Sequence, residues 1–229
     1  MNFQLTEEHL AVREAAREFA QSELLPGVTD RDTEAKFPTE QIKKMGELGF
    51  MGMMTDPKYN GGGMDTLSYV LAMEEISKVD ASASVSMSVN NSLVLWGLEK
   101  YGSDAQKEKY IPKLATGEVI GAFCLSEPEA GSDATSQRTT AELKGDHYLL
   151  NGTKNWITNG NTASVYLVIA QTDPSKGHKG ISAFIVEKGW QGFVVGKKED
   201  KLGIRGSDTH SLMFTDVKVP VDLLLRWKL

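Results

Sequence analysis

The spacing of apolar residues changes once along the chain, near residue 118, and this change limits the possible folds more than any other feature. Before it, apolar side chains recur at helical spacing; after it, they form short runs rich in β-branched and aromatic residues. Helices followed by strands, without alternation, argue against a doubly wound nucleotide fold. We predict an α+β protein with an all-helical domain over residues 1–117 and a β-barrel or sandwich domain over 118–220.

Capping residues locate several of the predicted helices. Thr6 is the expected N-cap of a first helix that ends by Pro26, and Thr39 is the expected cap of a second. Residues 66–79 are apolar on nearly every side, which predicts a helix buried between neighbours. The last predicted helix of the domain begins with a capping box at Ser103 and ends by residue 117.

The helix predicted around residues 82–96 has two different faces. Val85, Val89, Leu93 and Trp96 share one face, and four serines keep the opposite face slim. A slim face permits close packing against another helix. Together with Asn90 and Asn91 it could instead line a ligand cavity, and the sequence leaves both possibilities open.

Short strands separated by turn residues are predicted throughout the second domain. Residues 144–146 and 174–180 have the composition of hairpin loops. The strands are predicted at Val119–Leu125, Tyr148–Leu150, Val165–Ala170, Ile181–Val186, Phe193–Val195 and Ser211–Phe214.

Composition excludes several classes of function. The net charge is −6 and no basic block is present, which argues against a nucleic-acid partner. The single cysteine, Cys124, cannot form an internal disulfide. No apolar run approaches the roughly 20 residues of a membrane span. Because the amino terminus resembles no signal sequence, we expect a soluble cytoplasmic protein.

The stretch FCLSEPEAGSD, from Phe123 to Asp133, joins an apolar strand to a loop rich in hydrogen-bond donors. Ser126, Ser132 and neighbouring amides could bind the polar edge of a ring or a phosphate, and Gly131 would allow a close approach. An ordinary strand-to-loop exit explains the same residues.

Two further polar motifs interrupt the predicted strands. In KNWITNG (154–160), Trp156 and Thr158 lie two residues apart, so an extended strand would place them on one face. They could stack on a planar heterocycle and bond its edge, although a lone tryptophan is more often part of a core. In LGIRGSDT (202–209) we expect a turn in which Arg205 pairs with Asp208, and a ligand rim is the alternative.

Metal and hydrolase chemistry have no support in the sequence. The four histidines are far apart and none has a Cys or His partner at ligand spacing. No serine stands in a Gly-x-Ser-x-Gly context. We therefore expect neither a metal site nor a hydrolytic nucleophile.

Four ordered motifs, CLSEPEAGSDATS, NWITNG, LGIRGSDT and FTDVKVP, closely resemble those of the acyl-CoA dehydrogenase family, most of all its short-chain, butyryl-CoA-type members. The resemblance covers almost the whole chain. It implies a helical N-terminal domain, a middle β domain, a C-terminal helical bundle that we expect to be absent from this chain, FAD between the last two domains, and a homotetramer.

The resemblance also implies site residues. Leu125 (through its amide) and Ser126 would meet the pyrimidine edge of the flavin. Ser132 would lie near the pyrophosphate and would also bind the acyl-CoA substrate, while Trp156 would stack on the ring and Thr158 would bond its N5. The implied cofactor-binding set is Phe123, Cys124, Leu125, Ser126, Glu127, Pro128, Glu129, Ala130, Gly131, Ser132, Trp156, Ile157 and Thr158.

The implied reaction is FAD-dependent α,β-dehydrogenation of a short-chain acyl-CoA to a trans-2-enoyl-CoA, as in β-oxidation of fatty acids, with electron-transferring flavoprotein as acceptor. The family's catalytic glutamate belongs to the C-terminal domain, so we expect no catalytic residue in this chain. Glu127 and Glu129 would lie on the wrong side of the flavin for this base.

The sequence departs from the family after Pro220, so residues 221–229 form an atypical tail, which suggests a truncated or altered end. We therefore expect the isolated chain to be inactive and to hold FAD poorly. An acyl-CoA oxidase, which shares the half-reaction, and a catalytically silent acyl-CoA- and flavin-binding module are the alternatives.

Overall fold

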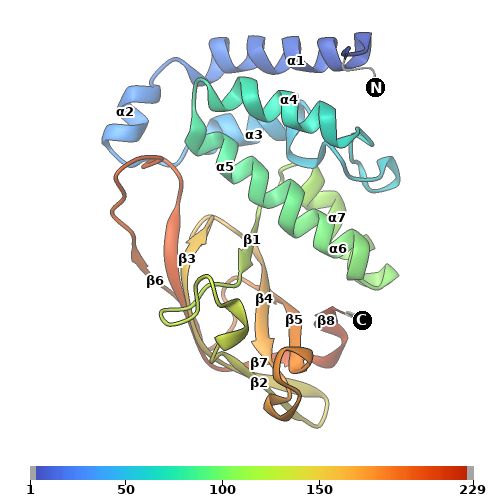
Figure 1. The fold of residues 1–229 in the computed structure, drawn as a ribbon, viewed down its shortest axis with the longest axis vertical. Helices are drawn as coiled ribbons and strands as arrows, with labels where there is room; N and C mark the ends of the chain where they lie inside the picture. The colour runs from blue at the N-terminus through green and yellow to red at the C-terminus, as the bar shows by residue number, and fades with distance from the viewer. Residues whose placement is uncertain (1–3, 226–229) are drawn as a thin grey trace.

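The structure, a computed structural model, describes residues 4–225 and places its helices at one end and its strands at the other (Figure 1). One cluster of buried apolar side chains lies among the helices, and a second lies within the sheet region and against the helices that cover it. The predicted order, a helical region followed by a β region, is confirmed. The exact domain boundaries stay predictions. No helix between residues 4 and 225 is long and apolar enough to cross a bilayer.

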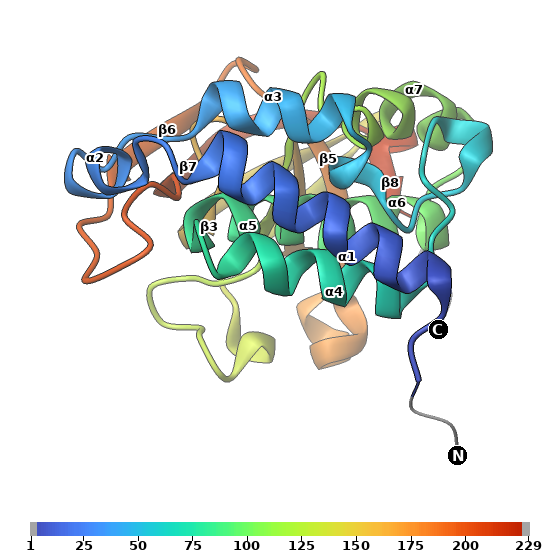
Figure 2. The ribbon, with the colours of Figure 1, turned by 90° about the horizontal axis from the view of Figure 1, so that it is seen from above.

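The helical region contains α1 (Glu7–Phe19), α2 (Val28–Thr33), α3 (Thr39–Glu47), α4 (Thr66–Ser77), α5 (Ala81–Ser88), α6 (Trp96–Tyr101) and α7 (Asp104–Ala115). Thr6 caps α1 by accepting the amide of His9, and Ser103 caps α7 in a capping box with Gln106. Both predicted caps are therefore confirmed. Figure 2 shows α1 alongside α4, the closest pairing in this region.

The sequence-based predictions differ from the structure at three places in this region. Helix α2 was not predicted, because six residues are too few for a clear helical period. Thr39 is the first residue of α3, and Pro38 holds the cap position. Helix α4 is not buried on every side, since Leu67 and Val70 are exposed.

Residues 81–101 form one long helix in which α5 passes through a π-helical segment, Val89–Leu95, into α6. Ser82, Ser84 and Ser86 are buried, so the slim face packs closely against its neighbours. The Asn90 amide donates to the carbonyl oxygens of Met51 and Leu114, and its oxygen accepts the amide of Gly121. Asn91 is likewise bonded to backbone. These asparagines support the chain, and no ligand cavity is needed to explain them.

The β region contains β1 (Gly121–Cys124), β2 (Thr140–Lys144), β3 (His147–Thr158), β4 (Val165–Gln171), β5 (Ile181–Glu187), β6 (Phe193–Lys198), β7 (Thr209–Pro220) and β8 (Leu224–Leu225). The strand order is β6-β7-β3-β2-β4-β5-β8, and β1 pairs with β4 in parallel. Both predicted hairpin loops are present. Strand β2 was not predicted, because its sequence, TAELK, alternates only weakly.

This sheet folds on itself into two facing halves. Strand β2 meets β4 at a single residue pair, Thr140 with Gln171, so the sheet is weakest there. Across the core, the ring of Tyr148 on β3 lies 4.9 Å from that of Phe184 on β5. The rings of Tyr166 on β4 and Phe193 on β6 are 4.8 Å apart. Because neither pair joins neighbouring strands, the two halves pack face to face, as in the predicted sandwich.

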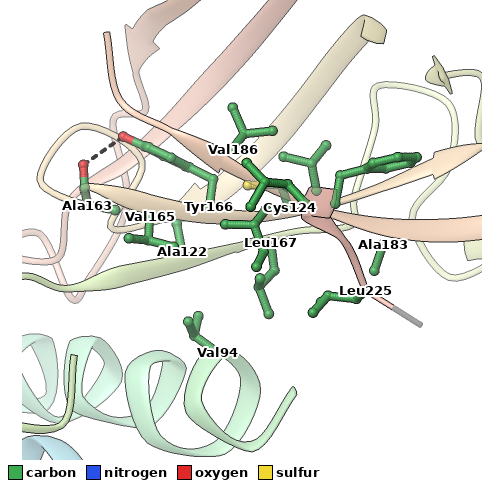
Figure 3. Close-up of a cluster of buried hydrophobic side chains, with 14 of the residues drawn as sticks. Val94, Ala122, Cys124, Ala163, Val165, Tyr166, Leu167, Ala183, Val186 and Leu225 are labelled. Carbon is green, nitrogen blue, oxygen red and sulfur yellow. Dashed lines mark hydrogen bonds between the residues drawn. The ribbon is translucent and has the colours of Figure 1, made fainter. Parts of the chain in front are cut away.

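The helical region rests on β1 and β4 (Figure 3). Val94, from the long helix, points at Ala122 and Leu167. A side chain at Gly121 would collide with Val94, since its Cβ would lie 2.6 Å from a methyl carbon of that residue. Glycine at this position therefore lets helix and sheet approach closely.

The predicted tail is described only in part. Val221–Leu223 form a single 3₁₀ turn, and β8 adds to the edge of β5. Residues 226–229 of this tail, and residues 1–3 of the predicted leaderless amino terminus, lie outside the described residues.

Candidate functional site

The segment that follows β1 forms a tight turn at the end of the strand. The amide of Glu127 donates to the carbonyl of Ala130 at 3.0 Å, and the amide of Ala130 donates back at 3.2 Å. This reciprocal pair puts Pro128 and Glu129 at the tip of the turn, where both are exposed. Gly131, Ser132 and Asp133 follow in open backbone and are also exposed. The turn thus presents the polar part of the first motif to the surface.

Lys154 holds this turn against β3. Its side chain is fully buried, and its ammonium donates to the Leu125 carbonyl at 2.9 Å, to Glu127 Oε1 at 2.7 Å and to Gln137 Oε1 at 3.3 Å. Next along β3, the amide of Asn155 donates to the carbonyl of Ser126 at 2.9 Å. The first and second motifs, about 30 residues apart in sequence, are therefore in direct contact.

Glu127 is an internal anchor in this structure. Its carboxylate is buried and accepts the amides of Arg138 and Thr139 as well as the Lys154 ammonium. Desolvation opposes its ionisation, but these hydrogen bonds outweigh that cost and keep the pKa of Glu127 below its usual value. Burial lowers the pKa of Lys154, and the bond to Glu127 opposes this shift. We describe the pair as ionised, because each charge meets its full set of partners.

Trp156 is an exposed tryptophan with an unusual backbone. It lies in an irregularity of the β3–β7 ladder between Lys154 and Ile157, and its φ of 60° falls in the left-handed region. Few residues other than glycine, asparagine and aspartate adopt this region. The side chain is 59% exposed, whereas Ile157 is buried and Thr158 half-buried. Trp156 and Thr158 therefore both lie outside the core, and a bulge rather than the expected regular strand places them.

The side chains of the predicted cofactor-binding set fall into two groups. Those of Ser126, Pro128, Glu129, Ser132, Trp156 and Thr158, with Phe123 and Leu125, are exposed or partly exposed, and the backbone of Gly131 is exposed as well. Those of Cys124, Glu127, Ala130 and Ile157 are buried, so any cofactor contact at these positions must come through backbone atoms. Figure 3 shows Cys124 among the buried side chains of the apolar cluster. Burial raises the pKa of this thiol, which therefore stays protonated.

The remaining carboxylates near the turn also have partners. Glu129 forms an ion pair with Arg138 at 2.6 Å. Asp133 accepts hydrogen bonds from the hydroxyls of Ser136 and Thr135, which lower its pKa. A general base works best with a pKa near the operating pH. Neither the bonds of Glu127 nor those of Asp133 move the pKa in that direction.

The prediction for the third motif is wrong in its pairing. Arg205 bonds to Asp200 at 2.8 Å and to the backbone of Asp32 and Lys201. Asp208 instead accepts the amides of Asn161 and Thr162 and contacts His210 at 2.7 Å. The third motif therefore binds the loop after β3 through Asp208. Thr162 and Asp208 are 46 residues apart, so a rule based on local turns cannot predict this contact.

Two apolar cavities adjoin the first motif. One, of about 450 Å³, lies between the helices and the sheet and is lined by Tyr69, Leu93 and Trp96 among others. The second, of about 310 Å³, lies beside Leu125 and His178. Both are lined by Phe123, Ile169 and Ala183, so the two cavities adjoin along β1, β4 and β5. Within residues 4–225, no group of three or more His, Cys, Asp or Glu side chains could hold a metal ion.

Sequence reasoning missed Lys154 and Gln137. A signal for Lys154 was present, because it falls among the inward-facing positions of β3, with Leu150 and Ile157. A charged residue at an apolar position implies a buried partner. Glu127 belongs to the implied cofactor-binding set, and the partner that its side chain meets in the structure is this lysine.

Family comparison covers nearly the whole chain. Residues 6–118 match the model described as "Acyl-CoA dehydrogenase, N-terminal domain", and residues 122–217 match "Acyl-CoA dehydrogenase, middle domain". The chain is 48% identical to the short-chain specific acyl-CoA dehydrogenase of Clostridium acetobutylicum, over 98% of this chain and 59% of the relative. It is 50% identical to the mitochondrial short-chain enzyme of Rattus norvegicus, over 97% of this chain and 54% of the relative. The chain thus spans little more than half of these relatives.

Solved structures give the same result. Butyryl-CoA dehydrogenase from Megasphaera elsdenii superposes with a TM-score of 0.94 at 44% identity, over 98% of this chain and 60% of that one. A structure from work on the electron transferring flavoprotein of Acidaminococcus fermentans has a TM-score of 0.96 at 48% identity, over 98% and 59%. An acyl-CoA dehydrogenase complexed with FAD from Bacillus anthracis has a TM-score of 0.90 at 35% identity, over 97% and 38%.

Proposed function

Because the chain belongs to the acyl-CoA dehydrogenase family, we propose that its surface at the turn after β1 and at Trp156 binds the flavin of FAD, and that the whole protein dehydrogenates a short-chain acyl-CoA. The observation that carries this proposal is the direct contact of the first two motifs. The Asn155–Ser126 hydrogen bond places a donor-rich turn beside an exposed, bulged tryptophan.

The residues present fit such a ligand. Trp156 offers an exposed aromatic face for stacking against a planar ring. Within the described chain, the amides of Leu125 and Ser126 and the hydroxyls of Ser126 and Thr158 donate to no other protein group. These are the donors that a heterocycle with several acceptor atoms requires.

The bound flavin would supply acceptance of a hydride from the substrate. The chain's own residues would bind and orient it: Leu125 and Ser126 at the pyrimidine edge, Thr158 at N5 and Trp156 on the ring. Donors fixed in advance at these atoms stabilise charge that builds up there. Ser132, exposed beyond Gly131, would serve the pyrophosphate and the acyl-CoA.

We also propose that the proton-abstracting base is none of the carboxylates in the turn. Glu127 is tied to Lys154, Glu129 pairs with Arg138, and the hydroxyls around Asp133 lower its pKa. The 229-residue chain alone should then form little or no enoyl-CoA. Rapid dehydrogenation by the 229-residue chain alone would require a base within this chain, and it would contradict this part of the proposal.

The substrate class and the electron acceptor follow from the relatives. The two curated relatives are named as short-chain specific enzymes, and one similar structure comes from work on an electron transferring flavoprotein. We propose the same substrate class and acceptor for the whole protein that contains this chain.

The test has two parts. Titration of the chain with FAD, followed by flavin fluorescence, should reveal weak but saturable binding; no saturable binding even at high FAD concentration would overturn the proposed cofactor site. The whole protein should reduce electron-transferring flavoprotein when supplied with butyryl-CoA. Stoichiometric hydrogen peroxide formed instead would favour the oxidase alternative, and flavin binding without turnover would favour the silent binding module.

A further inference from the structure

We propose that Lys154 and Glu127 are positioning residues that orient the Leu125–Ser126 backbone toward the flavin. The proposal rests on the proposed function, because it states that a buried ion pair fixes the backbone that would contact the flavin. Neither side chain reaches the surface, so neither is expected to touch the flavin.

The hydrogen bonds of the Lys154–Glu127 pair are complete. The Lys154 ammonium has three hydrogens and three acceptors, on Leu125, Glu127 and Gln137. The Glu127 carboxylate accepts from Lys154 and from the amides of Arg138 and Thr139. A buried charge pair is costly unless its partners are complete and well aligned. This pair therefore joins β3, the turn after β1 and the approach to β2 at one point.

Lys154 also fixes the direction of the peptide plane between Leu125 and Ser126. In a trans peptide the carbonyl and the following N–H point in opposite directions. Lys154 holds the Leu125 carbonyl toward the interior, so the N–H of Ser126 is turned the other way, toward the open side of the turn. No described group accepts this N–H. The buried ammonium thus decides which way a free donor points.

The next carbonyl along the turn, that of Ser126, is also fixed. Asn155 donates to the Ser126 carbonyl, and Asn155 directly follows Lys154 and precedes the bulged Trp156. The turn and the tryptophan are consequently positioned by consecutive residues of one strand. Loss of the ion pair would free the turn to move relative to Trp156, even if the rest of the sheet stayed folded.

The experiment compares the wild-type 229-residue chain with Lys154→Met, Glu127→Met and the double variant. Each single substitution leaves one buried charge without its partner and should lower the unfolding midpoint. The double variant replaces the pair by apolar side chains of similar size and should recover most of that loss. It cannot restore the bond to the Leu125 carbonyl. We therefore expect its dissociation constant for FAD to rise by about tenfold or more despite near-normal stability.

A readout without flavin separates this proposal from the proposed function. In the double variant, hydrogen exchange at the Asn155 amide should accelerate, whereas exchange at Ile185 on β5 should stay unchanged. Glu75→Gln, which breaks the Arg17–Glu75 pair in the helical region, is the control for general destabilisation and should leave FAD affinity and Asn155 exchange unchanged.

The outcomes are distinct. A double variant with wild-type FAD affinity and wild-type Asn155 exchange would overturn the positioning role. If the wild-type chain binds no FAD, the proposed function fails, and the Asn155 exchange alone decides whether the pair fixes the turn.

Discussion

At the scale of single residues, Trp156 shows how conformation and exposure point to the same role. A bulky side chain in the left-handed region costs about 1–2 kcal/mol, and such costs persist where surrounding structure enforces them. Here the enforcing contacts lie on both sides, with Lys154 and Asn155 bonded to the turn and Ile157 buried. The exposed indole gains little from the fold itself, which favours a role in binding.

Replacing Trp156 by alanine should weaken FAD binding while leaving the fold intact. Loss of ring stacking should raise the dissociation constant about three- to tenfold, corresponding to about 1 kcal/mol. The free energy of unfolding should change by less than about 0.5 kcal/mol, because the side chain is mostly exposed. Both quantities are measured by FAD titration and by urea unfolding.

Trp96→Ala is the matched control for this substitution, since Trp96 is 46% exposed but lies on α6. It should leave FAD affinity unchanged. Equal FAD affinities for Trp156→Ala and the wild-type chain would argue against stacking at Trp156.

The sequence predicted the participants of the candidate site better than their contacts. Exposed Trp156, half-buried Thr158 and the donor-rich turn were identified as ligand candidates from side-chain chemistry. The Lys154–Glu127 pair and the bonds of Asp208 were not, because each joins segments that are distant in sequence. Chemistry can be read locally, whereas pairing depends on the tertiary fold.

At the scale of elements, a buried carboxylate joins α1 to α4. Glu75 on α4 is buried and accepts hydrogen bonds from Arg17 on α1 and from Lys78. The bonds from Arg17 are the main cause that lowers the pKa of Glu75 to about 2, against the opposing effect of burial. The ionised form is therefore the one that stabilises the folded chain.

This shift predicts how stability depends on pH. A carboxylate with a lowered pKa stabilises the fold above its usual value of 4.5, and this contribution disappears as the pH falls from 4.5 toward about 2. Glu75→Gln should lower the free energy of unfolding by about 1–3 kcal/mol at pH 7. As the pH falls from 4.5 toward about 2, the free energy of unfolding should decrease less in this variant than in the wild-type chain. Urea unfolding across the pH series measures both effects.

The neighbouring Glu74→Gln is the matched control, because Glu74 is exposed and its carboxylate pairs with Lys78 at the surface. Its pH profile should follow that of the wild-type chain. A parallel profile for Glu75→Gln would show that the α1–α4 pair adds nothing measurable.

Helices with strong caps and strands with clear alternation were predicted, and short or irregular elements were not. Thr6 and Ser103 carry caps that depend only on residues three positions away. Helix α2 has only six residues, too few for a periodic signal, and strand β2 lacks the run of β-branched and aromatic residues on which strand prediction depends. The sequence predicts a single helix around the π-helical segment at Val89–Leu95 and does not distinguish this segment from its α-helical neighbours.

At the scale of the whole molecule, both halves of the sheet and the helical region meet at β1 and β4. The candidate site lies where β1 ends, so the core that supports the fold also supports the turn. The family resemblance predicted this arrangement of regions, but the single Thr140–Gln171 join between the halves of the sheet emerges only from the three-dimensional pairing.

The chain also exposes an apolar face. Val70 on α4, Leu93 and Trp96 are each at least 40% exposed and line the cavity of about 450 Å³ together. Contiguous apolar surface of this kind promotes association in water. Val70 belongs to residues 66–79, the segment that the sequence predicted to be buried on all sides.

Val70→Glu should therefore reduce self-association and the binding of an apolar dye such as ANS, without loss of stability beyond about 0.5 kcal/mol, because the side chain is half-exposed on a helix surface. Sedimentation velocity over a range of concentrations measures the first effect. Leu143→Glu introduces the same charge at a similarly exposed leucine on β2, away from this face, and should change neither property. If both variants reduce association equally, added charge is the cause and the apolar face is not.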